Sequence, residues 1–342
     1  MSLNELNATA RALVAPGKGI LAADESGGTI KKRFDSIGVE STETNRRDYR
    51  EMLFTTQGAG DYISGVILYD ETIRQSAGDG TPLVKLLQDQ GIIPGIKVDA
   101  GAKPLAFSEG ETVTEGLDGL RERLAEYREL GARFAKWRAT YSVSNGDGHP
   151  SDYCVDVNAH ALARYAALCQ EASIVPIVEP EVYMEGDHTI HESFLATERA
   201  QAAMFHALLH QNVEFEGILL KPNMVLPGYD CTKQVSDEEI AEATIRCFHV
   251  TVPAAVPGVV FLSGGQSDEQ ATARLNAMNK LGPHPWQLSF SYGRALQAPA
   301  LKAWKGAAAN VDAGRAALLH RARMNSLARS GSYSPDMEKS AA

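Results

Sequence analysis

The feature that most limits the possible folds is a regular alternation of short apolar runs with helical patterns. The runs are rich in Ile, Val, Leu and Phe and are bounded by Gly or Pro, which is typical of strands. They occupy residues 18–25, 62–70, 92–100, 134–141, 174–181, 215–223, 258–265 and 286–293. Between them, apolar residues recur every three or four positions, for example from Leu117 to Leu130. Continuously apolar strands that alternate with amphipathic helices predict a parallel α/β architecture.

Eight such units favour closure into a single (β/α)8 TIM barrel. This fold takes ~250 residues and grows by insertion, so a chain of 342 residues accommodates it. Periodicity alone leaves an open doubly wound sheet as an alternative. No Pro-, Gly- or Ser-rich linker divides the chain. We therefore expect one barrel domain over residues 1–327 and a flexible C-terminal tail over residues 328–342, where Ser is frequent.

Charge and composition exclude several classes of protein. The formal net charge of -10 argues against a general nucleic-acid binder and against attachment to anionic membranes. The four cysteines form no CxxC pair, which predicts free thiols in a reducing compartment. No apolar signal core opens the chain, and the longest apolar stretch is interrupted by proline and too short to span a bilayer. We expect a cytoplasmic protein with no membrane or nucleic-acid partner.

Charged side chains gather at the C-terminal ends of the predicted strands, the edge where barrel enzymes build their sites. Residues two apart on a strand point the same way. Three such pairs are therefore expected to face one cavity: Lys97 with Asp99, Lys136 with Arg138, and Glu179 with Glu181. The alternative is that these charges only mark where each strand meets solvent.

Lys221 is the candidate nucleophile. It ends the sixth run and is flanked by two leucines and a proline. A free lysine has a pKa of ~10.4, and both apolar surroundings and neighbouring cations disfavour the charged ammonium. Lys97, Lys136 and Arg138 are the candidate neighbouring cations. The alternative is an ordinary strand-end lysine whose amine reaches water.

Three carboxylates are candidates for acid–base chemistry. Glu179 and Glu181 are expected on one face, and two adjacent carboxylates push one pKa upward, which suits proton transfer near neutrality. Asp24 ends the first run and is a second candidate base. Its alternative role is an N-cap for the segment that follows.

Two glycine-containing loops resemble anion-binding sites. The sequences SGGQS (263–267) and SYGRA (291–295) follow the seventh and eighth runs, the usual position of a barrel's phosphate site. Arg294 can contact phosphate with two N–H groups. A second basic cluster lies at residues 29–33 and includes Lys32 and Arg33. Two separated cationic sites suit a substrate phosphorylated at both ends, whereas each glycine loop alone is also compatible with a plain turn.

A metal site is not favoured. His206 and His210 lie four residues apart in a predicted helix, which permits a metal pair. Neither follows a strand and no HExxH motif accompanies them, so packing or surface histidines are the preferred interpretation. The chain also lacks a P-loop, a GxSxG motif and a GxGxxG motif after its first run.

Taken together, the strand-end motifs resemble those of class I fructose-bisphosphate aldolases over residues 5–325. The motifs are GKGILAADES (17–26), GIKVD (95–99), FAKWR (134–138), VPIVEPE (175–181), LLKPNMV (219–225), FLSGGQS (261–267) and SFSYGRALQ (289–297). The resemblance implies a Schiff-base lysine at Lys221, a general acid/base at Glu179 and catalytic partners at Lys136 and Asp24. Glu181 completes the expected catalytic set.

The resemblance also implies substrate contacts. Arg138 and Lys97 would contact the substrate or line its site. One phosphate would be bound by Ser263, Gly264, Gly265, Ser291, Gly293 and Arg294. The other would be bound by Thr29, Lys32 and Arg33. The expected activity is reversible cleavage of fructose 1,6-bisphosphate to dihydroxyacetone phosphate and glyceraldehyde 3-phosphate, in glycolysis and gluconeogenesis, by a cytoplasmic homotetramer that needs no metal or cofactor.

The tail departs from the family pattern. Familiar animal and plant members end in a Tyr that assists protonation of the enamine, whereas this chain ends in Lys-Ser-Ala-Ala. We therefore expect weaker dependence on the tail. A transaldolase-like Schiff-base barrel, a metal-dependent aldolase and a catalytically silent binding barrel are the functional alternatives.

Overall fold

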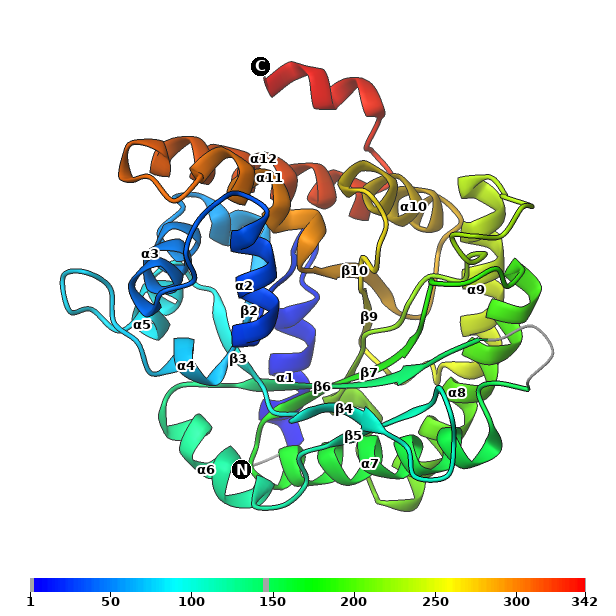
Figure 1. Ribbon diagram of the computed structural model, residues 1–342. Coiled ribbons are helices and arrows are strands. Elements are labelled where there is room, and N and C mark those ends of the chain that lie inside the picture. The colour runs from blue at the N-terminus through cyan, green and yellow to red at the C-terminus, as the bar shows by residue number, and fades with distance from the viewer. Residues whose placement is uncertain (1–2, 144–147, 342) are drawn as a thin grey trace.

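The computed structural model describes residues 3–143 and 148–341, and within them eight parallel strands close into a barrel (Figure 1). The strands follow the order β1-β10-β9-β8-β7-β6-β3-β2, and β2 pairs with β1 to complete the ring. Their bounds are β1 Gly19–Ala23, β2 Ile63–Leu68, β3 Ile93–Lys97, β6 Phe134–Tyr141, β7 Val175–Val182, β8 Leu219–Leu220, β9 Gly258–Phe261 and β10 Gln287–Tyr292. The predicted (β/α)8 barrel is confirmed, and the open doubly wound sheet is wrong.

The sixth strand is much shorter than expected. The apolar run over residues 215–223 contains a 3-10 helix, η2 (Phe215–Gly217), and then only the two residues of β8. Lys221 still donates its backbone N–H to the carbonyl of Val178 at 2.8 Å. Pro222 has no N–H to donate, although its carbonyl still accepts the backbone N–H of Leu262 at 3.0 Å. Lys221 is therefore held by the sheet at its backbone while its side chain is at the barrel mouth.

A β-hairpin between β3 and β6 was not expected from the sequence. It consists of β4 (Gly101–Pro104) and β5 (Thr112–Glu115), which pair in antiparallel fashion. The hairpin packs beside β6, where the hydroxyl of Thr114 donates to the carbonyl of Arg138 at 2.7 Å. It therefore supports the strand that carries two of the candidate site residues.

Helices surround the barrel as an outer layer (Figure 1). The α-helices are α1 Leu3–Leu13, α2 Gly27–Asp35, α3 Glu43–Phe54, α4 Asp70–Ile73, α5 Leu83–Asp89, α6 Leu120–Glu129, α7 Asp152–Glu171, α8 Ile190–His210, α9 Asp237–Thr251, α10 Asp268–Lys280, α11 Arg294–Trp304 and α12 Val311–Arg329. The remaining 3-10 helices are η1 Ala59–Asp61, η3 Ala308–Asn310 and η4 Pro335–Ala341. Capping boxes fix the starts of α8, α9 and α10, because a Ser or Thr N-cap and a Glu or Gln three residues later exchange hydrogen bonds.

The barrel interior is packed with side chains. Phe134 and Phe290 fill it, and glycines on neighbouring strands make room for their rings. A Cβ at Gly95 would lie 2.3 Å from the Phe134 ring, and one at Gly19 would lie 2.5 Å from the Phe290 ring. Leu13 of α1 joins the same apolar cluster as Phe134 and helps to close the end of the barrel away from the candidate site.

The C-terminal part departs from the expected domain boundary. Helix α12 runs through to Arg329, so the expected boundary at residue 327 falls inside a helix. Beyond it Tyr333 is only 4% exposed, and its hydroxyl donates to Glu338 at 2.9 Å. Glu338 in turn pairs with Arg321 and His320 of α12. Flexibility of residues 328–342 stays a prediction.

Membrane insertion through helices has no candidate segment in the part of the chain that the structure describes. None of the helices within residues 3–143 and 148–341 combines the length and the apolar character needed to cross a bilayer.

Candidate active site

A cavity of about 360 Å³ opens at the C-terminal ends of the barrel strands and contains most of the predicted site residues. Its lining includes Asp24, Thr29, Arg33, Lys97, Lys136, Arg138, Glu179, Glu181, Lys221, Ser263, Gly264, Ser291, Gly293 and Arg294. Residues separated by two positions on β3, β6 and β7 do share this cavity, as the alternation predicts. Charges that merely mark solvent contact would not converge in this way, and several of them are buried.

Two predicted residues do not reach the cavity lining. Lys32 is exposed on α2, one position before Arg33, and the helical rotation turns it toward solvent. Gly265 lies under Tyr229, because a Cβ there would come within 2.6 Å of the Tyr229 hydroxyl. Neither residue lines the cavity, so a role for Lys32 and Gly265 in binding phosphate stays a prediction.

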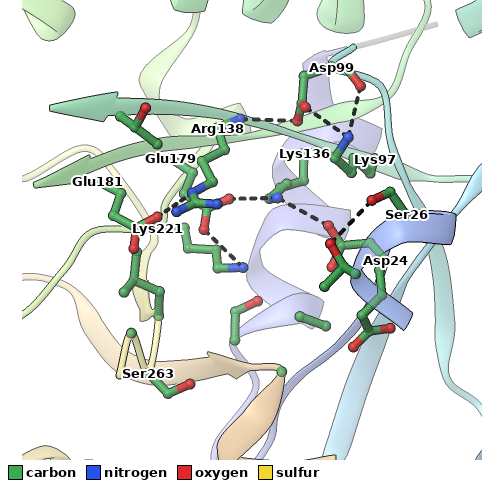
Figure 2. Close-up of a pocket in the computed structure, with 18 of the residues that line it drawn as sticks. Asp24, Ser26, Lys97, Asp99, Lys136, Arg138, Glu179, Glu181, Lys221 and Ser263 are labelled. Carbon is green, nitrogen blue, oxygen red and sulfur yellow. Dashed lines mark hydrogen bonds and ion pairs between the residues drawn. The ribbon is translucent and has the colours of Figure 1, made fainter. Parts of the chain in front are cut away.

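The centre of the site is a row of alternating charges from three strands and the turn after β1 (Figure 2). Nζ of Lys221 lies 3.3 Å from Oε1 of Glu179, and the other oxygen of that carboxylate lies 2.9 Å from Nζ of Lys136. Lys136 also contacts Oδ2 of Asp24 at 3.1 Å. Lys221, Lys136 and Glu179 are each 5% exposed or less. The carboxyl group of Glu179 thus lies close enough to the Lys221 amine to give it a proton or to take one from it.

Electrostatics keep Asp24, Glu179 and Lys136 charged. Burial disfavours the carboxylates of Asp24 and Glu179, but the cations of Lys136 and Lys221 outweigh it, and the pKa of each carboxyl is lowered. Burial also disfavours the ammonium of Lys136, but Asp24 and Glu179 outweigh that cost and raise its pKa. Asp24 is therefore an ion-pair partner. Its alternative role as an N-cap is wrong, because Ser26 occupies the N-cap position of α2.

Glu181 behaves differently from Glu179. Burial raises the pKa of Glu181, and the negative charge of Glu179 adds to this effect despite the nearby Arg138. The two carboxyls therefore shift in opposite directions, which is the separation expected of a close pair. Glu181 is bonded to the guanidinium of Arg138, which lies on the neighbouring strand β6.

Each cation expected near Lys221 has a carboxylate partner. Lys97 pairs with Oδ1 of Asp99 at 2.8 Å, in addition to the Lys136 and Arg138 pairs already described. Asp99 also accepts the backbone N–H of Arg138 at 3.3 Å, so it connects β3 to β6. The cations therefore lie within a compensated network and not as a bare positive cluster.

The loops after β9 and β10 have the features expected of the predicted anion site. Gly264 adopts φ +55°, a left-handed conformation that glycine tolerates without strain, and its carbonyl accepts a hydrogen bond from Arg294. Helix α11 begins at Arg294 and presents its N-terminal N–H groups here. The hydroxyl of Ser291 is buried with no partner among residues 3–143 and 148–341 and is available to a ligand.

Arg33 lies beside the loop after β10, although the sequence assigned it to the other phosphate site. A Cβ at Gly293 would lie 3.4 Å from Nη2 of Arg33, so the guanidinium adjoins the loop after β10. The sequence had placed residues 29–33 in a separate phosphate site. Arg33 reaches over because α2 follows β1, and β1 is the direct neighbour of β10.

The second cationic cluster lies across the mouth. Lys97 on β3 and Arg138 on β6 stand three or four places round the ring from β10 and β9. Lys221 and Glu179, on the intervening side, lie between the two clusters. The site therefore offers two separated cationic ends with an amine between them, as a substrate phosphorylated at both ends requires.

Several residues that line or support the cavity were missed from the sequence. Glu25 is 7% exposed and binds both Arg33 and Arg50, with Oε2 lying 2.8 Å from Nη2 of Arg50. Its position at the end of the first run was a usable signal. Arg50 gave none, because a charged residue within a helix normally faces water. Tyr183 and Thr140 also line the cavity and extend the alternation of β7 and β6.

The part of the chain described here contains no cluster of three or more His, Cys, Asp or Glu side chains arranged to hold a metal ion. His206 and His210 lie on α8, away from the cavity, and their rings pack edge to face with centroids 4.3 Å apart. The packing interpretation of this pair fits the structure.

Comparison with known proteins identifies the family. The family model for class-I fructose-bisphosphate aldolase matches residues 5–342. The chain belongs to the class I fructose-bisphosphate aldolase family. It is 58% identical over 334 residues to a Xylella fastidiosa protein named "Probable fructose-bisphosphate aldolase class 1", covering 97% of this chain and 99% of that protein. It is 57% identical over 329 residues to fructose-bisphosphate aldolase 1 of Toxoplasma gondii, covering 96% and 91% of the two chains.

The fold agrees with that of a solved aldolase. The Plasmodium falciparum fructose-bisphosphate aldolase superimposes with a TM-score of 0.96 at 51% identity, covering 97% of this chain and 95% of that one. The protein is thus an enzyme of the lyase class, a fructose-bisphosphate aldolase. The alternatives of a transaldolase-like barrel and of a catalytically silent barrel do not hold.

Proposed function

We propose that this aldolase cleaves fructose 1,6-bisphosphate reversibly, through a Schiff base on Lys221, to dihydroxyacetone phosphate and glyceraldehyde 3-phosphate. The observation that supports this most strongly is the buried row Lys221–Glu179–Lys136–Asp24, which lies between two cationic clusters. An amine nucleophile needs a proton carrier at hydrogen-bond distance, and Glu179 is 3.3 Å away.

Imine formation uses Lys221 and Glu179. The neutral amine of Lys221 attacks the ketone carbon C2, and the carbonyl oxygen takes up a proton to form a carbinolamine. Glu179 then delivers the proton with which that oxygen leaves as water, and the C=N⁺ bond forms. Because Lys136 contacts the other oxygen of Glu179, it can stabilise the carboxylate whenever the proton has moved away.

Carbon–carbon cleavage uses the iminium as an electron sink. Asp24 accepts the proton of the C4 hydroxyl, the C4 oxygen becomes an aldehyde, and the electrons of the C3–C4 bond move to the iminium nitrogen. Glyceraldehyde 3-phosphate leaves, and an enamine of dihydroxyacetone phosphate remains on Lys221. Protonation of the enamine at C3 and hydrolysis of the imine by water release the second product and restore the amine.

Substrate orientation follows from the order of the strands. The C1 phosphate is attached one carbon from the atom that Lys221 attacks, so it belongs in the nearer anion site. Strand β8 adjoins β9, which places Ser263 and Gly264 beside Lys221. The C6 phosphate, four carbons from C2, is assigned to Lys97 and Arg138 across the mouth.

The cellular setting is part of the proposal. We infer a homotetramer that acts in the cytoplasm, in glycolysis and gluconeogenesis. A supporting relative is fructose-bisphosphate aldolase 4, cytosolic, of Arabidopsis thaliana, at 54% identity over 98% of this chain and 85% of that one. Light scattering on the purified protein tests the subunit count, and a monomer at micromolar concentration would contradict the tetramer.

A turnover assay tests the proposed reaction. The wild-type protein should release both triose phosphates from fructose 1,6-bisphosphate at an equal rate, with full activity after treatment with EDTA. Lys221→Ala should lose at least about 10³-fold in kcat. The control, Lys85→Ala, changes an exposed lysine of α5 and should retain full activity. Loss of activity with EDTA would indicate a metal-dependent aldolase and refute the mechanism.

A further inference from the structure

The cavity wall beside Arg138 contains a tyrosine that the proposed mechanism does not use. Tyr183 directly follows β7 and lines the cavity together with Glu181, two residues earlier. Its backbone N–H donates to the carbonyl of Tyr141 at 2.9 Å, which continues the β6–β7 pairing past the end of the strand. The main chain of Tyr183 is therefore fixed relative to the strand that carries Arg138.

The ring of Tyr183 supports the guanidinium of Arg138. Cζ of Arg138 lies 5.7 Å from the ring centroid, within the range of a cation–π contact. The side chain of Arg138 is 40% exposed and would otherwise sample many rotamers. A ring that contacts the face of a guanidinium leaves the N–H groups at its edge free to bind other groups. Glu181 occupies some of these N–H groups in the present structure.

The hydroxyl of Tyr183 is available to a ligand. Within residues 3–143 and 148–341 it has no hydrogen-bond partner, and the side chain is only partly buried at the cavity wall. A phosphate that engaged the edge of Arg138 would compete with Glu181 for the N–H groups. The ring would hold the guanidinium in place during that exchange, and the hydroxyl could donate a further hydrogen bond to the phosphate.

We propose that Tyr183 is a specificity-determining residue that selects sugars phosphorylated at the end far from the ketone, by holding Arg138 and by hydrogen bonding to that phosphate. This role builds on the proposed cleavage of fructose 1,6-bisphosphate, in which the C6 phosphate binds Lys97 and Arg138. It predicts that Tyr183 matters for a bisphosphate and not for a sugar that lacks the far phosphate.

The test compares two substrates in two variants. Tyr183→Ala should lower kcat/KM for fructose 1,6-bisphosphate by about tenfold to thirtyfold, the size of a partly desolvated cation–π contact with a hydrogen bond. The value for fructose 1-phosphate should fall by less than about twofold, since that substrate makes no contact with Arg138 through a phosphate. Tyr183→Phe keeps the ring and the shape and should lose about threefold to tenfold for the bisphosphate alone.

The control is Tyr153→Ala, which changes a tyrosine that is 48% exposed on α7 and should leave both values unchanged. Equal losses for the two substrates in Tyr183→Ala would show a structural effect and overturn the proposal. No loss for either substrate in Tyr183→Ala would also overturn it. Absence of bisphosphate cleavage by the wild-type protein would instead refute the proposed function itself, so the two failures are distinguishable.

Discussion

At the scale of single residues, Lys136 organises the candidate site. It contacts Glu179 and Asp24, and all three side chains are largely buried. An isolated charge at this depth would be costly, whereas a cation between two carboxylates satisfies all three groups. Removing the cation would leave two buried carboxylates close to each other. Glu179 would then hold its proton more tightly and transfer it less readily.

Replacement of Lys136 by methionine tests this description. Lys136→Met keeps the apolar stem and removes the charge, so we expect kcat for fructose 1,6-bisphosphate to fall by about 10²–10³-fold. Steady-state kinetics give the loss, and circular dichroism checks that the fold is retained. Lys85→Met, at an exposed position, is the control. A folded Lys136→Met enzyme that keeps more than about half of the wild-type activity would refute the role of Lys136 in proton transfer by Glu179.

The pH dependence of stability follows from Asp24. Its pKa is lowered in the folded protein relative to about 3.9 for an unfolded chain. The stabilisation is therefore present above pH ~4 and is lost as the pH falls below that value toward the folded pKa. Asp24→Asn cannot titrate, so the difference in free energy of unfolding between wild type and this variant should narrow from pH 5 to pH 3.

Urea unfolding at each pH measures that difference. The control is Asp312→Asn, because the Asp312 side chain is 96% exposed, and its difference from wild type should stay near zero at both pH values. If the difference in free energy of unfolding between wild type and Asp24→Asn stayed constant or widened toward pH 3, the folded state would not favour the Asp24 carboxylate.

The sequence predicted the polar edge of the barrel well because alternation along a strand is a local property. Lys97, Lys136 and Glu179 each lie where a two-residue period places them. The reach of Arg33 to Gly293 could not be predicted in this way, since it depends on which strands are neighbours in the closed ring. Arg50 was missed for a related reason: its burial beside Glu25 is a contact between distant elements.

At the scale of elements, the C-terminal end of α12 holds together segments from the two ends of the chain. Arg329, its last residue, is 9% exposed and donates to the carbonyls of Val14, Ala15, Lys18 and Leu288. Burial lowers the pKa of Arg329 to about 10. The helix thereby connects the segment after α1 to the strand β10. The sequence placed a domain boundary here because Ser and Gly follow, and composition does not reveal such a contact.

Replacement of Arg329 should therefore destabilise the fold. Arg329→Met leaves several buried carbonyls without donors, and we expect a loss of about 3 kcal/mol or more in free energy of unfolding. Arg323→Met changes an exposed arginine of the same helix and should cost less than about 0.5 kcal/mol. Urea titration compares the two variants. If Arg329→Met and Arg323→Met had the same free energy of unfolding, the carbonyl contacts of Arg329 would contribute nothing measurable.

At the scale of the whole molecule, an acidic protein concentrates cations in one cavity. The net charge is -10, yet the cavity lining includes six Lys and Arg side chains: Arg33, Lys97, Lys136, Arg138, Lys221 and Arg294. Most of these cations have carboxylate partners, so repulsion among the cavity's positive charges is largely compensated. A phosphate dianion can replace a carboxylate at either cluster, and the apolar barrel below keeps the reacting amine out of bulk water.

The C-terminal segment should contribute to stability more than to catalysis. The described residues after α12 contribute none of the cavity lining, whereas Glu338 pairs with Arg321 and His320. Removal of residues 336–342 should lower the free energy of unfolding by about 1 kcal/mol and leave kcat within about twofold of wild type. Glu338→Gln reproduces the loss of the ion pairs in the full chain. A tenfold fall in kcat on truncation alone would show that the tail takes part in turnover.

The most direct test of the central claim is to trap the covalent intermediate. Borohydride reduction in the presence of dihydroxyacetone phosphate converts an imine to a stable secondary amine, and peptide mass mapping locates it. We predict a single adduct on Lys221 and none in the Lys221→Ala variant. An adduct on another lysine, or full activity with no adduct on any, would contradict the account.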